Sequence, residues 1–152
     1  MFSPSAQHAM RALLYLARRA DPRPVQSREI AASEAIPPAY LSKILRQLSR
    51  GGLLRSTMGP GGGYTLARPA GDILVGEILT AVDELPHLQT NCVLGRGKCS
   101  DRGHCALHDQ WKHVVVAMTQ GIGSLTLEEI AHRTPAPVVR PARRTRTRGG
   151  RA

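Results

Sequence analysis

The stretch GPGGGYTLA, residues 59–67, begins with four glycines and one proline in five positions. The segments LLRSTM before this run and YTLA after it predict two short strands, and glycine permits the tight turn between them. A P-loop would end in lysine followed by serine or threonine and would open a helix, and a dinucleotide-binding loop would also open a helix. Neither feature follows here, so the stretch predicts a β-hairpin rather than a nucleotide site.

The residues before this hairpin predict two helices joined by a short turn. SREIAASEAI is expected to form a short helix with Ser27 as its N-cap and Glu29 in its first turn. The next helix is expected from Pro38 to just before Gly51, because proline suits a first turn and glycine suits a helix end. Its apolar stripe consists of Leu41, Ile44, Leu45 and Leu48.

Two short helices followed by a hairpin form a winged helix-turn-helix, whose second helix enters the major groove of DNA. The basic residues of this helix fall on a different face from its apolar stripe, and the glycines of the hairpin allow close approach to phosphates. A solvated surface and a plain tight turn are the alternatives. The candidate DNA-binding residues are Ser27, Arg28, Tyr40, Lys43, Arg46, Arg50, Arg55, Ser56, Thr57, Gly61, Gly62 and Tyr64.

Apolar residues at helical spacing predict further helices on both sides of this unit. One covers residues 6–17 and another covers residues 73–85, while residues 85–104 are expected to form an irregular loop. A long helix is predicted to begin at Cys105, with an apolar stripe that continues to Leu125. Little chain remains for that stripe to pack against, which favours pairing with a second copy; an ordinary core helix is the alternative.

A last short helix is predicted after Leu125, because Thr126 and Glu129 have the spacing of a capping box. Beyond it, residues 134–152 contain six arginines and no acid, and they account for much of the net charge of +10. Their composition cannot build a core, so residues 133–152 are expected to be a disordered basic tail. Such a tail is either simply solvated or attracts nucleic acid without sequence preference.

Apolar runs are too short for a membrane span, which requires about 18 residues. Arginines, beginning with Arg11, also interrupt the first apolar stretch, which is unlike a signal peptide. The sequence therefore predicts a cytoplasmic protein with no membrane partner.

The chain has three cysteines, all between positions 92 and 105. An odd number without signs of secretion favours a metal site or reactive thiols over disulfides. Cys92, Cys99 and Cys105, with His108 three positions later, would make a complete four-ligand set. Structural zinc sites and ferredoxins both use closer cysteine spacings. Spacing alone therefore leaves zinc and an iron–sulfur cluster equally open, with bare redox-active thiols as a third alternative.

The segments AMRALLYLA, IPPAYLSKILRQLSRGGLL, GPGGGYTLA and VGEILTAVDE, and the cysteine loop with CALHDQW, resemble the Rrf-two family of winged-helix transcription regulators over about residues 2–132. This family includes iron–sulfur cluster regulators and nitric-oxide-sensing repressors. The resemblance implies a homodimer that binds a double-stranded DNA operator, with an affinity set by an iron–sulfur cluster. Cys92, Cys99, Cys105 and His108 match the cluster ligands, and a 2Fe–2S cluster is favoured over 4Fe–4S.

Three positions depart from the family pattern. The first cysteine spacing is one residue longer than usual, Met58 replaces a basic residue before the wing glycine, and Ser42 replaces a glutamate of the second helix. In the nitric-oxide sensors of this family, the fourth cluster ligand looks like an aspartate near the start of the first helix. The chain has Gln7 at that position, which favours His108 as the fourth ligand.

The predicted fold is mainly α, a winged helix-turn-helix domain with a long C-terminal dimerisation helix. The predicted parts are a DNA-binding domain in residues 1–84, a cluster-binding loop in 85–108, a dimerisation helix and short capping helix in 105–132, and the basic tail in 133–152. The predicted function is a transcriptional regulator, most simply a repressor, that senses redox state, nitric oxide, or iron or sulfur status. The alternative keeps the winged helix with zinc or redox-active thiols.

A thiol oxidoreductase or a metal hydrolase is a weaker alternative. The chain lacks a C-x-x-C motif, and no general base stands beside an open metal position. No catalytic residue is therefore predicted.

Overall fold

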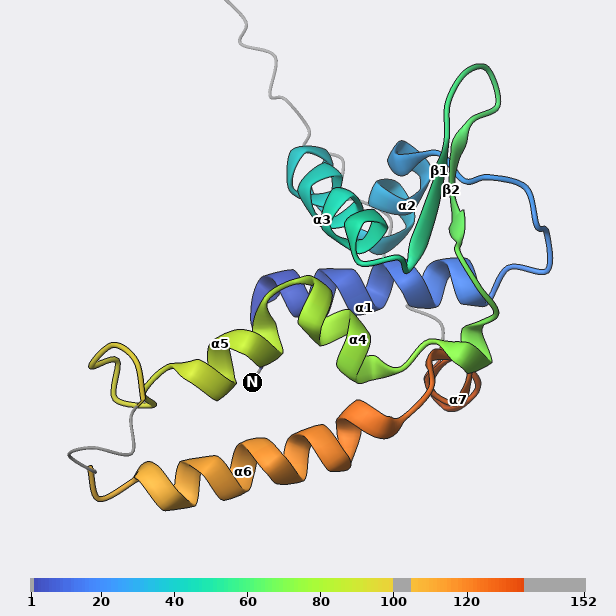
Figure 1. Cartoon of the computed structure of the whole chain (residues 1–152). Helices are drawn as coiled ribbons and strands as arrows, with labels where there is room; N and C mark the ends of the chain where they lie inside the picture. The colour runs from blue at the N-terminus through green and yellow to red at the C-terminus, as the bar shows by residue number, and fades with distance from the viewer. Residues whose placement is uncertain (1, 100–104, 136–152) are drawn as a thin grey trace, which may run out of the picture.

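The computed structural model describes residues 2–99 and 105–135, and Figure 1 shows a mainly helical chain with one small sheet. No helix in these ranges is both long and apolar enough to cross a membrane. The prediction of a disordered tail falls on residues that lie outside these ranges from position 136 onward. The elements in chain order are α1 (Pro4–Ala17), α2 (Ser27–Glu34), α3 (Pro38–Arg50), β1 (Leu54–Thr57), β2 (Gly63–Leu66), the 3-10 turn η1 (Ala70–Asp72), α4 (Val75–Ala81), α5 (Glu84–Thr90), α6 (His108–Gln120), the 3-10 turn η2 (Ile122–Ser124) and α7 (Leu127–Arg133).

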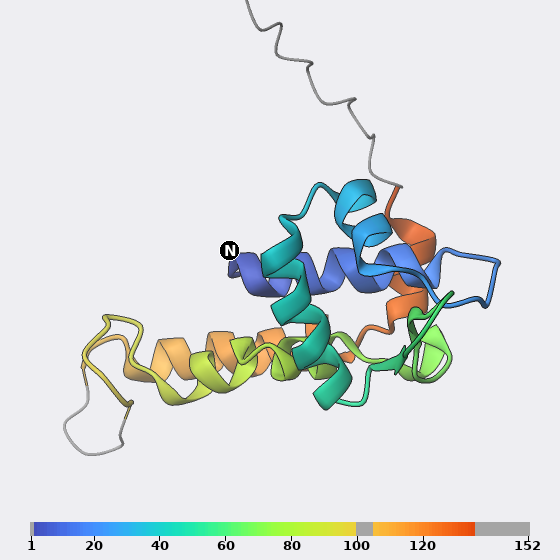
Figure 2. The same cartoon turned by 90° about the horizontal axis from the view of Figure 1, so that it is seen from above.

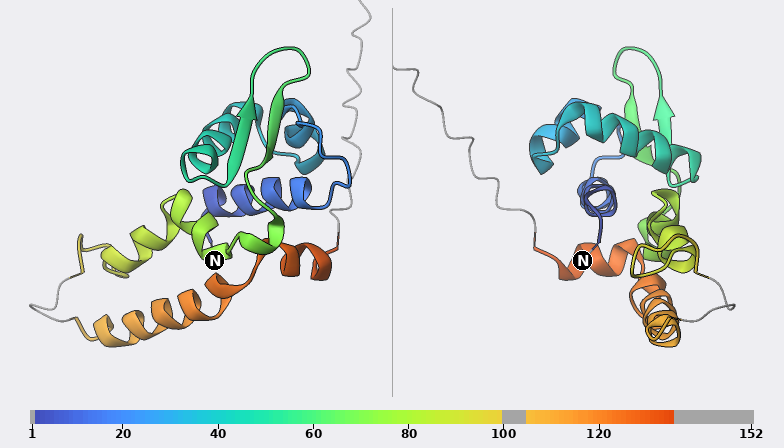
Figure 3. Two further views of the ribbon diagram at one scale, coloured as in Figure 1. Left: turned by 45° about the vertical axis from the view of Figure 1, so that its right-hand side comes forward. Right: turned by 90° about the vertical axis from the view of Figure 1, so that its left-hand side faces the viewer.

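Helix α1 is the centre of the body, and Figure 3 shows it end-on between α3 and α7. Its fully buried positions include Ala6, Ala9 and Ala12, whose small side chains let the neighbouring helices approach closely. Leu13 is also fully buried and lies on the same apolar stripe. The helix predicted over residues 6–17 is confirmed.

Helices α2 and α3 form the predicted helix-turn-helix, with the stripe Leu41, Ile44, Leu45 and Leu48 fully buried against the body. The prediction of Ser27 as N-cap is wrong by one position, since Ser27 is the first helical residue and Gln26 is the cap. Val25 immediately before it pairs with the wing, so the chain turns into the helix at Gln26. The Gln26 carbonyl then accepts the first amide hydrogen bonds of the helix.

The predicted hairpin is confirmed as an antiparallel wing in which Leu54 lies opposite Leu66. Val25 adds a third partner that sequence patterns did not predict. Its N–H donates to the Tyr64 carbonyl at 2.9 Å, and the Tyr64 N–H donates back at 2.8 Å. The wing is thereby attached to the segment that enters α2.

The glycines of the wing are required by its geometry. A Cβ atom at Gly62 would collide with the carbonyl oxygen of Thr57, and one at Gly63 would collide with that of Val25. Gly61 has φ +77°, in the left-handed region that other residues rarely adopt. The glycine run is therefore explained by a five-residue hairpin loop, residues 58–62, without any phosphate ligand.

The helix predicted over residues 73–85 is instead two helices. Asp83 adopts a left-handed conformation with φ +60°, which ends α4 and starts α5 in a new direction. Pro86 falls in the first turn of α5, where a missing N–H breaks no helical hydrogen bond. The irregular loop predicted from residue 85 is therefore wrong as far as Thr90.

The helix predicted to begin at Cys105 begins at His108 and ends at Gln120. Cys105 thus precedes the helix, and its carbonyl accepts the His108 N–H at 3.0 Å. Helices α5 and α6 and the described residues between them project from the body, with the cysteine segment at the far end (Figures 1 and 2). We call this projection the arm.

The chain returns from the arm to the body through α7. Leu127 is fully buried in the same core as α1, and its N–H donates to the Ile73 carbonyl at 2.8 Å. The Val75 N–H donates in turn to the Leu125 carbonyl at 2.9 Å. The residues that enter α4 and those that follow η2 are therefore held together at one place on the body.

The capping box predicted for the last helix is confirmed. The Thr126 hydroxyl accepts from the Glu129 N–H at 3.1 Å, and the Glu129 carboxylate accepts from the Thr126 N–H at 2.8 Å. We expect Thr126→Ala to lower the free energy of unfolding by about 1 kcal/mol, measured by urea denaturation. The matched control is Thr80→Ala, because the Thr80 hydroxyl only donates to a carbonyl one turn earlier in α4. Equal losses for both variants would contradict a specific role for the cap.

Candidate DNA-binding surface and cysteine site

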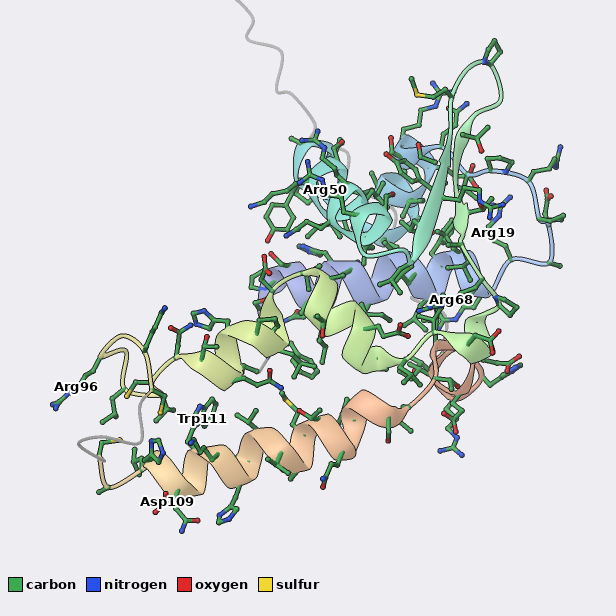
Figure 4. The ribbon with its side chains drawn as sticks, in the orientation of Figure 1. Arg19, Arg50, Arg68, Arg96, Asp109 and Trp111 are labelled. Carbon is green, nitrogen blue, oxygen red and sulfur yellow. The ribbon has the colours of Figure 1, made fainter. Side chains whose placement is uncertain are left out.

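The basic side chains of α3 lie on the face opposite its buried stripe. Lys43, Arg46 and Arg50 are all exposed, and so is Ser42 (Figure 4, Arg50 labelled). Arg28 is exposed and Ser27 is half-buried at the start of α2. The predicted recognition helix therefore leaves its cationic residues available to a partner.

The wing stands beside α2 and α3 on the same side of α1 (Figure 1). Of its predicted contact residues, Arg55, Ser56, Thr57 and Gly61 are exposed, while Gly62 and Tyr64 are half-buried. Met58, at the start of the hairpin loop, is 92% exposed. The α3 face and the wing together form one surface, which we call the reading surface.

Tyr40 is placed differently from the other predicted residues of α3. A hydrogen bond of 2.7 Å joins its hydroxyl to that of Ser5, and its ring packs edge-on against His8 with centroids 5.2 Å apart. Tyr40 thus attaches the start of α3 to α1. Its predicted contact with DNA stays a prediction.

We expect Tyr40→Phe to lower the free energy of unfolding by about 1 kcal/mol, because the Ser5 partner is lost. DNA affinity should change less than about twofold, since the hydroxyl is already engaged within the fold. Urea denaturation and fluorescence anisotropy with a bound duplex measure the two effects. Ser5→Ala is the matched variant. The double variant should lower the free energy of unfolding by less than the sum of the two single variants. A large loss of affinity in Tyr40→Phe alone would instead assign the hydroxyl to DNA.

An ion pair that sequence reasoning missed holds α2 against α1. Glu34, the last residue of α2, is only 3% exposed, and its carboxylate lies 3.3 Å from Arg11 Nε. The two residues are 23 positions apart, so no local pattern indicates the contact. Removing Arg11 would leave a buried carboxylate without this partner, which is strongly unfavourable.

The cysteine segment begins as a small hairpin at the end of α5. The Cys92 N–H donates to the Gly97 carbonyl, and the Cys99 N–H donates to the Thr90 carbonyl, both at 2.8 Å. Gly95 and Gly97 have φ values of +70° and +85°, which allow the tight turn. The hairpin fixes the separation between Cys92 and Cys99.

The four predicted ligands meet at the end of the arm as two pairs. Cys99 Sγ lies 3.1 Å from Nδ1 of His108, whose side chain is buried. The pKa of the Cys92 thiol is lowered by the backbone N–H groups of Leu94 and Arg96, and also by a hydrogen bond with the Cys105 side chain. All three cysteines are free thiols.

These pairs do not converge on a single point. Within residues 2–99 and 105–135, no three His, Cys, Asp or Glu side chains are arranged to hold one metal ion. A structural zinc ion needs four ligands around one centre, whereas each iron of a 2Fe–2S cluster takes two protein ligands. Among the described residues the candidate ligands therefore stand as two pairs rather than as one group.

The arm also carries an apolar surface. Trp111 joins its two helices, because the indole N–H donates to the Leu88 carbonyl at 3.2 Å (Figure 4). Cys99 and Trp111 border a hollow of about 330 Å³ between α5 and α6. Three residues of the predicted stripe, Leu107, Val114 and Ile122, are exposed, with Val114 56% and Ile122 43% exposed. Trp111, Met118 and Leu125 are half-buried, and Val115 is the one buried residue of the stripe.

Comparison with known proteins identifies the family. The model of the Rrf2 family, described as iron-dependent transcriptional regulator, matches residues 2–133. The chain belongs to the Rrf2 family. The HTH-type transcriptional regulator IscR of Klebsiella pneumoniae is 34% identical over 126 residues, which cover 83% of this chain and 76% of IscR. Rrf2 members are transcriptional regulators rather than enzymes, which confirms the predicted family and its DNA-binding role.

Solved Rrf2-type structures share the fold. CymR, the global cysteine regulator of B. subtilis, superposes with a TM-score of 0.72 at 22% identity, covering 89% of this chain and 98% of CymR. IscR of T. potens superposes with a TM-score of 0.69 at 23% identity, covering 89% of this chain and 88% of IscR. The predicted mainly α, winged helix-turn-helix class is therefore confirmed.

Proposed function

We propose that this Rrf2 regulator is a homodimer, most simply a repressor, whose affinity for a double-stranded operator is set by an iron–sulfur cluster. The observation that carries the proposal is the meeting of three thiols and one buried imidazole at the end of the arm. Cys92, Cys99, Cys105 and His108 are the proposed ligands. When bound, the cluster supplies a centre whose oxidation state and integrity respond to oxidants, nitric oxide and iron supply.

The donor chemistry supports two irons. Cys92 pairs with Cys105, and Cys99 pairs with His108, so these two pairs would supply the four protein ligands of a 2Fe–2S cluster. The backbone N–H groups that point at the Cys92 sulfur favour its thiolate, which is the ligating form. The His108 side chain is buried, which restricts its imidazole to an orientation beside Cys99.

The arm can influence the reading surface through two contacts. The Glu84 carboxylate, at the start of α5, accepts the Ser3 N–H of the α1 N-terminus at 3.0 Å. At the end of α3, a Cβ atom on Gly51 would lie only 2.9 Å from the Cβ of Ala81 in α4. A shift of α5 is thus passed to α1, α4 and α3. The state of the cysteine site biases the position of α3 by this route.

The surface of α6 supports the homodimer. Leu107, Val114 and Ile122 are each at least 43% exposed, and exposed apolar residues of this size favour an interaction site. Hollows of about 330 and 580 Å³ lie beside the helix and could receive apolar side chains of a second copy. A two-fold dimer presents two α3 helices, as operators with two half-sites require. The division into DNA-binding domain, cluster loop and dimerisation helix forms part of this proposal.

Anaerobic purification followed by visible absorption and by iron and acid-labile sulfide analysis tests the cluster. We expect a coloured protein with about two irons and two sulfides per chain. A colourless protein that binds neither iron nor sulfide, even after anaerobic reconstitution, would overturn the cluster proposal. One zinc ion per chain without sulfide would favour the structural alternative.

A second candidate is a switch made of thiols alone. It is favoured by the hydrogen bond between the Cys92 and Cys105 side chains and by the lowered pKa of Cys92. A peroxide supplies the two-electron oxidant: its O–O bond breaks, an S–S bond forms between the two sulfurs, and the two thiol protons leave on the peroxide oxygens. An iron-free protein whose DNA affinity changes reversibly with peroxide and dithiothreitol would support this candidate.

A further inference from the structure

We propose that Trp111 is a positioning residue of the cysteine site, which holds the cysteine hairpin against α6 and keeps Cys99 beside His108. The cysteine hairpin is the segment 91–99, whose ends pair as a short β-bridge. The proposal rests on the proposed function, because it assigns how one pair of candidate ligands is held together. It concerns contacts of the protein itself, so it can be tested with or without a cluster.

The indole of Trp111 caps the end of α5. In an uninterrupted helix the Leu88 carbonyl would accept the N–H of Cys92, four residues later. The Cys92 N–H instead donates to the Gly97 carbonyl inside the hairpin at 2.8 Å. The Leu88 carbonyl is thereby released from the helix, and Trp111 Nε1 donates to it at 3.2 Å. The indole therefore supplies a hydrogen bond that the turn into the hairpin has removed.

This hydrogen bond completes a closed path through the site. Trp111 lies three residues after His108, so the two side chains share a face of α6. On the other side, the Cys99 N–H donates at 2.8 Å to the carbonyl of Thr90, two residues after Leu88. Cys99 Sγ then lies 3.1 Å from Nδ1 of His108. A displacement of the last turn of α5 relative to α6 would therefore separate the sulfur from the imidazole.

Packing between the two helices does not replace this hydrogen bond. Leu88, Cys99 and Trp111 all border the hollow of about 330 Å³ between α5 and α6. A hollow leaves the side chains that line it without packing partners on one side. Val115, the one buried apolar residue of α6, lies a turn further from the cysteines. The position of the hairpin thus depends on the directional contact made by Trp111.

The test removes the indole N–H and keeps the ring. Trp111 is the single tryptophan of the chain, so an analogue supplied to growing cells in place of tryptophan changes this side chain alone. Benzothienylalanine has the shape of tryptophan with sulfur in place of the N–H. Trp111→Phe is the second variant, which also removes the donor. Metal-free, full-length protein is treated with diethyl pyrocarbonate, and the modification of each histidine is followed by mass spectrometry.

His108 is only 3% exposed, so it reacts when the end of the arm opens. We expect both variants to be modified at His108 about fivefold faster than the wild type, the factor that one lost hydrogen bond represents. Two histidines are internal controls whose rates should not change, because His113 is exposed on the same helix and His8 is half-buried on α1. After anaerobic reconstitution with iron and sulfide, both variants should also release iron to a chelator about fivefold faster.

Unchanged His108 modification, or unchanged iron release, in both variants would overturn the positioning role. A faster reaction in Trp111→Phe alone would assign Trp111 to packing and would overturn it as well. Faster modification of His8 together with His108 would mean that the whole fold is destabilised, which also contradicts the proposal. A wild type that binds no iron would overturn the cluster proposal alone, because the His108 measurement uses metal-free protein.

Discussion

Replacing Lys43 and Arg46 together with alanine is expected to weaken operator binding at least about 30-fold, because each lost contact costs about 1–3 kcal/mol. Both side chains are exposed on the face of α3 opposite the buried stripe, so the free energy of unfolding should not change. Fluorescence anisotropy with a duplex selected from random-sequence DNA by the wild type measures the loss. Urea denaturation measures the stability.

A matched control removes one lysine and one arginine elsewhere. Lys112 on α6 and Arg133 on α7 are also exposed, and α7 lies on the opposite side of α1 from α3 (Figure 3). The Lys112→Ala, Arg133→Ala variant has the same net charge as the α3 variant and should bind within about threefold of the wild type. Equal losses in the two variants would mean that net charge, rather than the α3 face, determines binding.

Cys99→Ser is expected to weaken the affinity for iron at least about 100-fold and thereby to lower the retained iron and sulfide, because even the outer partners of metal ligands are worth about 10–100-fold in metal affinity. Cys99 contributes to two features of the site, the end of the hairpin and the contact with His108. His108→Ala should also lower the retained iron and sulfide. Iron and sulfide analysis after anaerobic desalting measures each variant.

His113→Ala is the matched control, since His113 is an exposed histidine on the same helix. It should retain the wild-type iron content. Full iron content in Cys99→Ser would remove Cys99 from the ligand set. If chelation of the iron leaves DNA affinity unchanged in the wild type, the cluster has a structural role and does not set operator affinity.

Much of the body could be predicted because its determinants are local in sequence. The stripe from Leu41 to Leu48 follows the helical period, and the wing glycines lie where backbone geometry excludes a side chain. The capping box at Thr126 is likewise complete within four residues. Such features depend on neighbours a few positions away, so the sequence alone contains the information.

The remaining differences come from contacts between distant residues or from single backbone angles. The left-handed conformation of Asp83 divides a helix that hydrophobic spacing predicts to be continuous. The partners of Tyr40 and Glu34 lie on α1, more than 20 residues away, so no local pattern contains them. The four candidate ligands were predicted as a set, but their division into pairs depends on the hairpin at the end of α5.

The backbone hydrogen bonds between Val75 and Leu125 and between Ile73 and Leu127 have a consequence for how such proteins diversify. They join the residues that enter α4 to the residues that follow α6, and α4, with the buried Ile78 and Leu79, belongs to the core rather than to the arm. When the ends of an inserted segment are already held close together, doubling its length costs only about 0.6 kcal/mol of closure entropy. Arms of other lengths and ligand sets, inserted after α4 with α4 retained, should leave the winged helix folded.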